Sequence, residues 1–196
     1  PLSGKKPHDI NIHFIRENSE DFYVGLGARF TGGRSSETLE LKRKLYKARF
    51  KVEIDLEPGS EMGYQIGAIT DGGAERVVRY GLELARRKKL TRVTVIHKGN
   101  VLTKIYGVWL DRVRQVAREY PDIEMDFAIV DAATMHLVRS PERFQVIVAP
   151  NMFGDILSDL AASTVGGLGL APGGNINPDR KAGLSMFEPI HGSAPD

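Results

Sequence analysis

Short strand-like runs alternate with longer amphipathic segments from residue 64 onward, and this alternation limits the possible folds more than any other feature. Residues 92–97 (RVTVIH), 125–130 (MDFAIV) and 144–149 (FQVIVA) are short, apolar and rich in β-branched side chains, as buried strands are. Apolar residues then recur with helical spacing in 102–119 and 153–165, and a shorter helix follows MDFAIV. The expected apolar face of the 102–119 helix consists of Ile105, Val108, Trp109, Val113, Val116 and Ala117. Repeated strand–helix units predict an α/β fold.

One more strand–helix pair and one earlier strand lie before residue 92. The run DINIHFIR at 9–16 alternates apolar and polar side chains, which predicts a half-buried strand ending at Arg16. Residues 64–70 (YQIGAIT) predict a strand, and residues 74–89 predict a helix. The expected apolar face of that helix consists of Val77, Val78, Leu82 and Ala85. Its basic end, residues 86–89, complements the negative end of the helix dipole, so the charge cluster does not indicate nucleic-acid binding.

The residues between these two strands predict an arm outside the main layers. A Gly-rich stretch at 25–34 is followed by KARFKVEIDLE at 47–57, which alternates as a strand does. That run begins basic and becomes acidic, which suits a hairpin arm over about 26–60 that pairs with a second arm. A solvated surface hairpin explains the same pattern equally well.

Composition excludes several classes of protein. The 27 basic and 25 acidic residues leave a net charge of +2, too little to favour a nucleic-acid or membrane partner. There is no cysteine, which excludes disulfides and thiolate metal sites. No apolar run reaches membrane-spanning length, so a soluble, cytoplasmic protein is expected. The chain begins at Pro1 and stops at Asp196 after a Gly- and Pro-containing run, and we expect it to be a fragment.

Charged and polar residues follow the predicted strands at the positions where α/β proteins bind ligands. Arg16 closes the first strand, Lys98 follows RVTVIH, and Asp131 follows MDFAIV. Asn151 and Asp155 follow FQVIVA. One amine, one guanidinium and a set of carboxylates at one sheet edge predict a site for a divalent metal and a carboxylate-bearing substrate.

Asp155 and Asp159 are spaced i, i+4, so both project from one face of the predicted helix. Two neighbouring carboxylates repel each other unless a cation or protons neutralise them, and Mg²⁺ or Mn²⁺ prefers such hard oxygen ligands. A solvated helix edge is the alternative that the spacing alone favours. By themselves, Lys98 also fits a surface lysine and Tyr23 a core aromatic residue.

Six motifs along the chain resemble those of a known family, the β-decarboxylating dehydrogenases that act on isopropylmalate, isocitrate, homoisocitrate and tartrate or malate. They occur in the family's order and span nearly the whole chain. The motifs are IRENSEDFYVG (15–25), HKGNVL (97–102), VDAATMHLV (130–138), APNMFGDILSDLAA (149–162), GGLGLAPGGNIN (166–177) and FEPIHGSAPD (187–196).

The resemblance implies a metal site shared between two subunits. Asp155 and Asp159 would hold Mg²⁺ or Mn²⁺, with Asp131 contributed by the second subunit of a homodimer, and a tetramer is the alternative assembly. Arg16 would bind a substrate carboxylate, a task that suits a bidentate guanidinium. The metal would chelate the substrate hydroxyl and act as a Lewis acid during loss of CO₂.

The resemblance also assigns catalytic groups. Lys98, also from the second subunit, would assist deprotonation of the substrate hydroxyl, and Asp131 would act beside it. Tyr23 would protonate the carbon left after CO₂ departs. Asn100 would lie near the substrate and the nicotinamide.

The last ten residues resemble the family's loop around the adenosine end of the cofactor, although the G-x-G-x-x-G fingerprint is absent. The residues that would line this loop are Glu188, His191, Gly192, Ser193, Ala194 and Asp196. An acid at position 196 favours NAD, since a carboxylate accepts hydrogen bonds from ribose hydroxyls and repels a 2′-phosphate.

The resemblance divides the chain into two parts. Residues 1–165 would form the central dimer-forming domain that holds substrate and metal, and 166–196 would begin the return into the dinucleotide-binding domain. The family's preceding segment and its C-terminal return are missing, so we expect this chain alone to turn over nothing.

The substrate is not decided by these motifs. IRENSEDFY resembles the isopropylmalate and isocitrate branches, whereas NINPDR and MFEPIHG resemble the tartrate/malate branch. NAD-dependent oxidative decarboxylation of 3-isopropylmalate is the favoured function, with tartrate, D-malate, isocitrate or homoisocitrate as alternatives. Two alternatives come from other classes of function. One is a non-catalytic dimerisation or regulatory subunit of the same fold. The other is a metal-dependent phosphoryl-transfer enzyme, but this sequence has no phosphate-cradling loop of the G-x-x-x-x-G-K type to support it.

Overall fold

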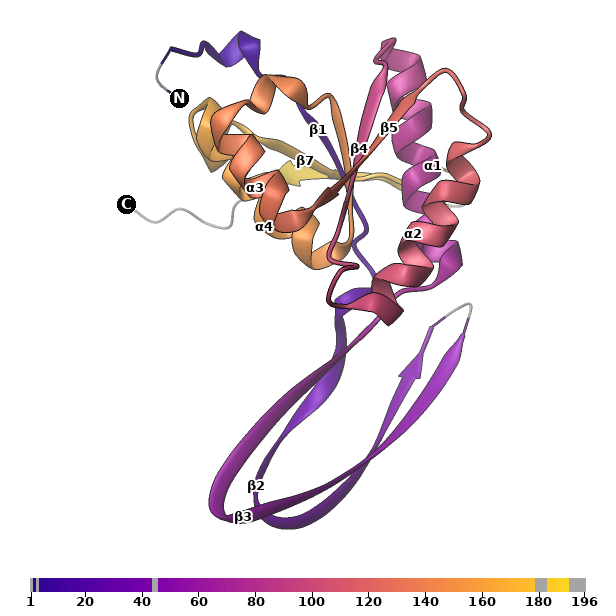
Figure 1. Cartoon of the computed structure of the whole chain (residues 1–196), viewed down its shortest axis with the longest axis vertical. Coiled ribbons are helices and arrows are strands. Elements are labelled where there is room, and N and C mark those ends of the chain that lie inside the picture. The colour runs from indigo at the N-terminus through magenta and orange to yellow at the C-terminus, as the bar shows by residue number, and fades with distance from the viewer. Residues whose placement is uncertain (1, 3, 44–45, 179–182, 191–196) are drawn as a thin grey trace.

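A parallel four-stranded sheet forms the centre of the protein, and helices cover both of its faces (Figure 1). The structure, a computed structural model, describes residues 2, 4–43, 46–178 and 183–190. The strand order is β1-β6-β4-β5. These strands are β1 (His13–Arg16), β4 (Arg92–His97), β5 (Glu124–Ile129) and β6 (Val146–Ala149). The predicted α/β fold is confirmed.

Two pairs of helices enclose the sheet. Helices α1 (Asp71–Lys88) and α2 (Thr103–Ala117) pack on each other over one face, and α3 (Val130–Arg139) and α4 (Asn151–Val165) pack on the other (Figure 1). Short 3₁₀ turns occur at Pro7–Asp9, Pro141–Arg143 and Leu168–Leu170. No helix in the described part of the chain is both long and apolar enough to span a membrane.

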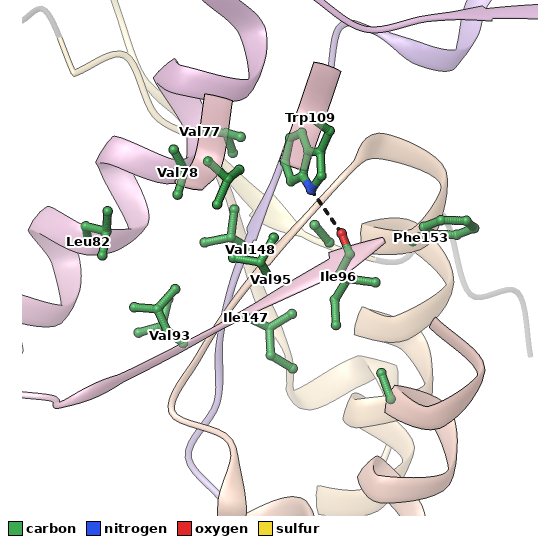
Figure 2. Close-up of a cluster of buried hydrophobic side chains, with 14 of the residues drawn as sticks. Val77, Val78, Leu82, Val93, Val95, Ile96, Trp109, Ile147, Val148 and Phe153 are labelled. Atoms are coloured by element: carbon green, nitrogen blue, oxygen red, sulfur yellow. Dashed lines mark hydrogen bonds between the residues drawn. The ribbon is translucent and has the colours of Figure 1, made fainter. Parts of the chain in front are cut away.

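The main core extends over both faces of the sheet, between the strands and the helices α1, α2, α3 and α4, and part of it is drawn in Figure 2. The predicted face of α1 is buried, and burying one Leu or Val side chain stabilises the fold by roughly 1.5–3 kcal/mol. Trp109 is fully buried, and its indole N–H donates to the carbonyl oxygen of Ile96 at 3.1 Å. The predicted face of α2 is wrong at Val108, which is 41% exposed, because Tyr106 fills the core in its place.

The first strand is shorter than the sequence suggests. The alternation at 9–16 predicts a strand from Asp9, but β1 begins only at His13. The Asp9 carboxylate accepts the backbone N–H of Lys6 at 2.8 Å and fixes a 3₁₀ turn, which takes residues 7–9 out of the strand.

A single long hairpin forms the arm, as the sequence predicted, but the strands predicted at 47–57 and 64–70 are parts of one continuous strand. Strand β2 (Asp21–Lys42) pairs with the antiparallel β3 (Lys47–Ala68), so the hairpin extends beyond 26–60 on both sides. The arm projects away from the sheet and curls back along its own length (Figure 1). The register between β2 and β3 shifts between Thr31 and Gly33. Gly33 and Gly59 both have a positive φ. Such an irregularity allows the hairpin to bend.

The distal half of the arm packs against its base. Leu41, near the end of β2, is buried with Val24 and Leu26 in a small second core. The Arg43 guanidinium donates to the carbonyl oxygen of Val24 at 3.2 Å. Beyond α4, β7 (Pro172–Asn175) and β8 (Met186–Pro189) form a separate two-stranded antiparallel ribbon.

Candidate functional site

The carboxyl ends of the four parallel strands bring the predicted site residues to one edge of the sheet. Arg16 ends β1, and its neighbour β6 leads directly into α4, which carries Asp155. Lys98 follows β4 and Asp131 follows β5, and these two strands pair with each other. Within one chain the residues form two clusters: an arginine cluster (Arg16, Tyr23, Asn151, Asp155) and a lysine pair (Lys98, Asp131).

Arg16 is the centre of the arginine cluster. Its Nε and Nη2 atoms both donate to Oδ1 of Asn151, at 2.9 and 2.8 Å, and its Nη1 donates to the carboxylate of Asp155. The Tyr23 hydroxyl donates to the other carboxylate oxygen of Asp155 at 3.1 Å. The Tyr23 ring also lies beside the guanidinium, with Cζ of Arg16 at 5.8 Å from the ring centroid. The cluster therefore joins a cation, a phenol and a carboxylate.

The first turn of α4 is shaped to receive Arg16. A side chain on Gly154 would place its Cβ 2.7 Å from Cγ of Arg16, so only glycine allows this close approach. The aliphatic stem of Arg16 consequently lies against the helix, and its charged end lies near the Asp155 side chain one residue further along.

Tyr23 lies on β2 at the base of the arm and is half exposed. Partial removal from water raises the pKa of its phenol, and the hydrogen bond to Asp155 raises it further. The phenol therefore carries its proton at neutral pH. A shallow, largely apolar hollow beside it is lined by Phe22, Tyr23, Gly25, Gln65, Leu102 and Met152.

The lysine pair joins a partly buried lysine to an exposed carboxylate. Lys98 forms an ion pair with Asp131, whose side chain is 65% exposed at the start of α3. Burial lowers the pKa of His97, and its Nδ1 accepts the N–H of Gly99 at 3.1 Å in the turn that carries Lys98. Asn100 is exposed in the same turn.

Asp159 lies one turn beyond Asp155 on α4 and is exposed. Two carboxylates on successive turns offer the hard oxygen donors that Mg²⁺ and Mn²⁺ prefer, so the donor chemistry fits such an ion. Among the described residues, however, no three acidic or histidine side chains converge to hold a metal within one chain. Further ligands would have to come from substrate, water or a second chain.

Comparison with known proteins places this geometry in a family. The family model described as isocitrate/isopropylmalate dehydrogenase matches residues 1–196. The chain belongs to the isocitrate/isopropylmalate dehydrogenase family.

Individual relatives agree with this assignment. The chain is 41% identical to a 3-isopropylmalate dehydrogenase of Thermobifida fusca and 50% identical to one of Clavibacter sepedonicus, in each case over all of this chain and 48% of the relative. The crystal structure of isocitrate dehydrogenase from Methylococcus capsulatus superposes with a TM-score of 0.76 at 40% identity. That match covers 95% of this chain and 47% of the other. The chain thus spans about half the length of the curated relatives it matches.

In this member of the isocitrate/isopropylmalate dehydrogenase family, a buried acidic loop supports the arginine cluster. Glu17, Glu20 and Asp21 lie between the end of β1 at Arg16 and the start of β2, and all three are buried. The Glu17 carboxylate accepts hydrogen bonds from Arg76 and from Ser19. These supporting residues were not predicted from the sequence. Three acids shortly after a strand that ends in a candidate substrate-binding arginine are the signal that could have found them.

Two contacts tie this loop to the helices around the site. The Glu20 carboxylate accepts the N–H and the hydroxyl of Thr70 at 2.8 and 2.7 Å, just before α1. The carboxylate of Asp21 accepts the N–H of Met152, in the first turn of α4, at 2.9 Å and the Tyr106 hydroxyl at 3.2 Å. No side chain of α4 caps its own N-terminus, so Asp21 satisfies one of the helix's free N–H groups.

Asp21 is an unusual residue in two respects. It has a φ of +67°, a left-handed conformation that costs a non-glycine residue free energy. Burial raises the pKa of its carboxyl, against the hydrogen bonds from Met152 and Tyr106, which lower it. The surrounding contacts thus hold Asp21 in place, a strained and buried acid that lies between Arg16 and Tyr23 in the sequence.

Of the predicted cofactor-binding residues, the structure describes only Glu188. It is exposed on β8, where its carboxylate accepts a hydrogen bond from Asn175 at 3.4 Å. The other five, His191, Gly192, Ser193, Ala194 and Asp196, lie outside the described residues.

Proposed function

We propose that this chain forms the metal-binding and substrate-binding half of an NAD-dependent enzyme that oxidises and decarboxylates a malate-type 2-hydroxy acid, with 3-isopropylmalate favoured. The observation that carries the proposal is the arginine cluster, in which Arg16, Tyr23 and Asp155 meet in one place. The reaction needs a carboxylate receptor, a proton donor and a metal ligand, and these three side chains supply one of each.

Two aspartates of one chain would hold the metal together with one from a second chain. Asp155 and Asp159 would contribute from α4, and Asp131 from the second copy. A bound Mg²⁺ or Mn²⁺ would withdraw electron density from the substrate oxygen and so ease loss of CO₂. The present ion pair between Arg16 and Asp155 fits this arrangement, because both groups turn toward one point where a substrate carboxylate and a cation would meet.

The side chains of the protein would bind the substrate and move its protons. Arg16 would bind a substrate carboxylate. Lys98 would take the proton of the substrate hydroxyl, while the carbon that bears this hydroxyl would lose a hydride to NAD. The bond to the β-carboxylate would then break with release of CO₂, its electron pair would remain on the adjacent carbon, and Tyr23 would deliver a proton there. The half-exposed phenol lies at the open side of the cluster, where a substrate carbon can approach it.

A homodimer with shared active sites is part of the proposal, and a tetramer built from such dimers is compatible with it. Two observations support it. Among the described residues, no hydrogen bond or ion pair joins the arginine cluster to the lysine pair. The outer surfaces of α3 and α4, which pack side by side, expose the apolar side chains Met135, Val138 and Ile156. An exposed apolar surface beside an incomplete site favours a second copy as its partner.

For the cofactor, we propose NAD held by the last ten residues. Glu188, His191, Gly192, Ser193, Ala194 and Asp196 would line its adenosine end, as the motif EPIHGSAPD suggests. A carboxylate at position 196 would accept hydrogen bonds from the ribose hydroxyls and exclude a 2′-phosphate.

Isocitrate is the second candidate substrate. The structural similarity to the Methylococcus capsulatus isocitrate dehydrogenase, at 40% identity, favours it over the remaining alternatives. The curated relatives named 3-isopropylmalate dehydrogenase match the whole chain at comparable or higher identity and keep 3-isopropylmalate first.

The proposal is tested by measuring NADH formation with the protein at its full natural length. A panel of 3-isopropylmalate, isocitrate, D-malate and tartrate would be assayed with Mn²⁺ and with a chelator. We expect turnover of one of these acids only when Mn²⁺ is present, with CO₂ released in equal amount. A folded, dimeric protein that oxidises none of them would support a non-catalytic subunit instead.

A further inference from the structure

Asn151 is buried at the start of α4, and its side chain contacts Arg16 without being one of the predicted substrate or metal ligands. We infer that Asn151 is a positioning residue, which holds the guanidinium of Arg16 in the orientation that receives a substrate carboxylate. This inference rests on the proposed function, in which Arg16 is the carboxylate receptor.

The hydrogen bonds occupy some N–H donors of the Arg16 guanidinium and leave others available to a ligand. Oδ1 of Asn151 accepts from both Nε and Nη2 of Arg16, and Nη1 donates to Asp155. An arginine has five N–H donors, and these contacts use three of them. One N–H remains on each terminal nitrogen. A bidentate carboxylate requires one donor from each of two nitrogens, and one N–H on each terminal nitrogen is the number that remains.

Asn151 is itself fixed from behind. Only 3% of its surface is exposed, and its Nδ2 donates to the carbonyl oxygen of Glu20 at 3.2 Å. Since Glu20 is anchored to Thr70 through its carboxylate, the support runs from α1 through the acidic loop to Asn151. The amide therefore cannot rotate away from Arg16 without leaving buried polar groups unpaired.

The charge of the residue at position 151 matters as much as its shape. An amide oxygen accepts the two N–H groups without placing a second negative charge beside Arg16, whose guanidinium already pairs with Asp155. A carboxylate of the same size would also accept them, but it would further neutralise the positive charge of Arg16. An asparagine at this position thus orients the receptor without weakening it.

The test compares Asn151→Ala and Asn151→Asp with the unmodified protein at its full natural length, using steady-state kinetics with Mn²⁺ and the preferred acid. We expect Asn151→Ala to raise KM for the acid about tenfold or more, as for loss of a charge-assisted hydrogen bond, with a smaller change in kcat. Asn151→Asp should raise this KM further, while KM for NAD stays within about twofold. Asn11→Ala, at an exposed asparagine, is the matched control.

A second measurement decides the inference even without turnover. The Nε–H of Arg16 is followed by ¹⁵N NMR, and we expect its exchange with water to accelerate at least about tenfold in Asn151→Ala and to stay slow in Asn151→Asp and Asn11→Ala. Equal exchange rates in the unmodified protein and folded Asn151→Ala would overturn the inference. Unchanged KM for the acid in both Asn151 variants would overturn it too. An unmodified protein inactive on every acid would instead contradict the proposed function.

Discussion

The arginine cluster and the lysine pair lie at the same edge of the sheet, yet they are built differently. Arg16 is held by Asn151 and Asp155 and is backed by a loop of three buried acids. Lys98 and Asp131 contact each other across the ends of two neighbouring strands, with Asp131 largely in solvent. The first cluster is completed by its own chain, and the second presents its charges outward.

This difference suits the proposed homodimer, in which the lysine pair would serve the site of the partner chain. A set of side chains that is braced from behind keeps its geometry in the isolated chain. An ion pair with one largely exposed partner contributes little to stability, and the exposed Asp131 carboxylate is free to contact a neighbouring molecule. We therefore expect substitutions in the arginine cluster to impair the site of their own chain. Substitutions in the lysine pair should impair the site of the partner chain in the proposed dimer.

The largest effect is expected from Asp155→Asn. Removing one carboxylate from the pair on α4 should lower the affinity of the full-length protein for Mn²⁺ by about 100-fold or more. Loss of a residue that only supports a metal ligand lowers the affinity less than this. Titration calorimetry measures this affinity. Asp111→Asn, at an exposed aspartate on α2, is the control and should have no effect. Unchanged Mn²⁺ affinity in Asp155→Asn would remove this residue from the metal site.

The next effect concerns assembly. Met135→Glu places a charge on the exposed apolar surface of α3, and burying an unpaired carboxylate in an interface is strongly unfavourable. We expect the dimer dissociation constant, measured by sedimentation, to rise about 100-fold. Gln115→Glu on α2 should leave it unchanged. A dimer of full stability in Met135→Glu would place the interface elsewhere.

Asp21→Asn tests the buried loop through its pH dependence. Because burial raises the pKa of this carboxyl, its contribution to stability is present below the ordinary aspartate pKa, about 3.9, and is lost as pH rises through the higher folded value. Asparagine does not titrate. The free energy of unfolding of Asp21→Asn, relative to the unmodified chain, should therefore increase between pH 4 and pH 7. A constant difference across this range would contradict a raised pKa.

The smallest effect is expected from Lys98→Ala on stability. The partly exposed pair with Asp131 should contribute less than about 1 kcal/mol to the free energy of unfolding. Denaturant titration of the isolated chain measures it. A loss of several kcal/mol would mean that the lysine pair stabilises the fold strongly. That result would contradict the difference drawn between the lysine pair and the arginine cluster.

Sequence patterns predicted the sheet and its helices well where the pattern is local. The strand 92–97 and the buried face of α1 follow from periodicity alone. Lys98 and Asp131 were expected at one edge because they end consecutive predicted strands, and they do meet there. The arm was less predictable, because Gly33 and Gly59 interrupt the alternation while the ladder resumes beyond them.

Other features depend on contacts that no local pattern encodes. Burial of Glu20 and Asp21 requires α1, α2 and α4 to meet around one loop, since their partners Thr70, Tyr106 and Met152 are far apart in sequence. The hydrogen bonds of Asn151 to Arg16 also span 135 residues. Such supports become visible only when the sheet order is known.

The central claim, an active site shared between two copies, is tested most directly by mixing two inactive variants at full length. Tyr23→Phe and Lys98→Met are unfolded together, refolded as a mixture and assayed for NADH formation. If each site takes Tyr23 from one chain and Lys98 from the other, half of the dimers are hybrids with one intact site, which predicts about a quarter of the unmodified activity. Activity no higher than that of either variant alone would show that both residues serve the same site within one chain.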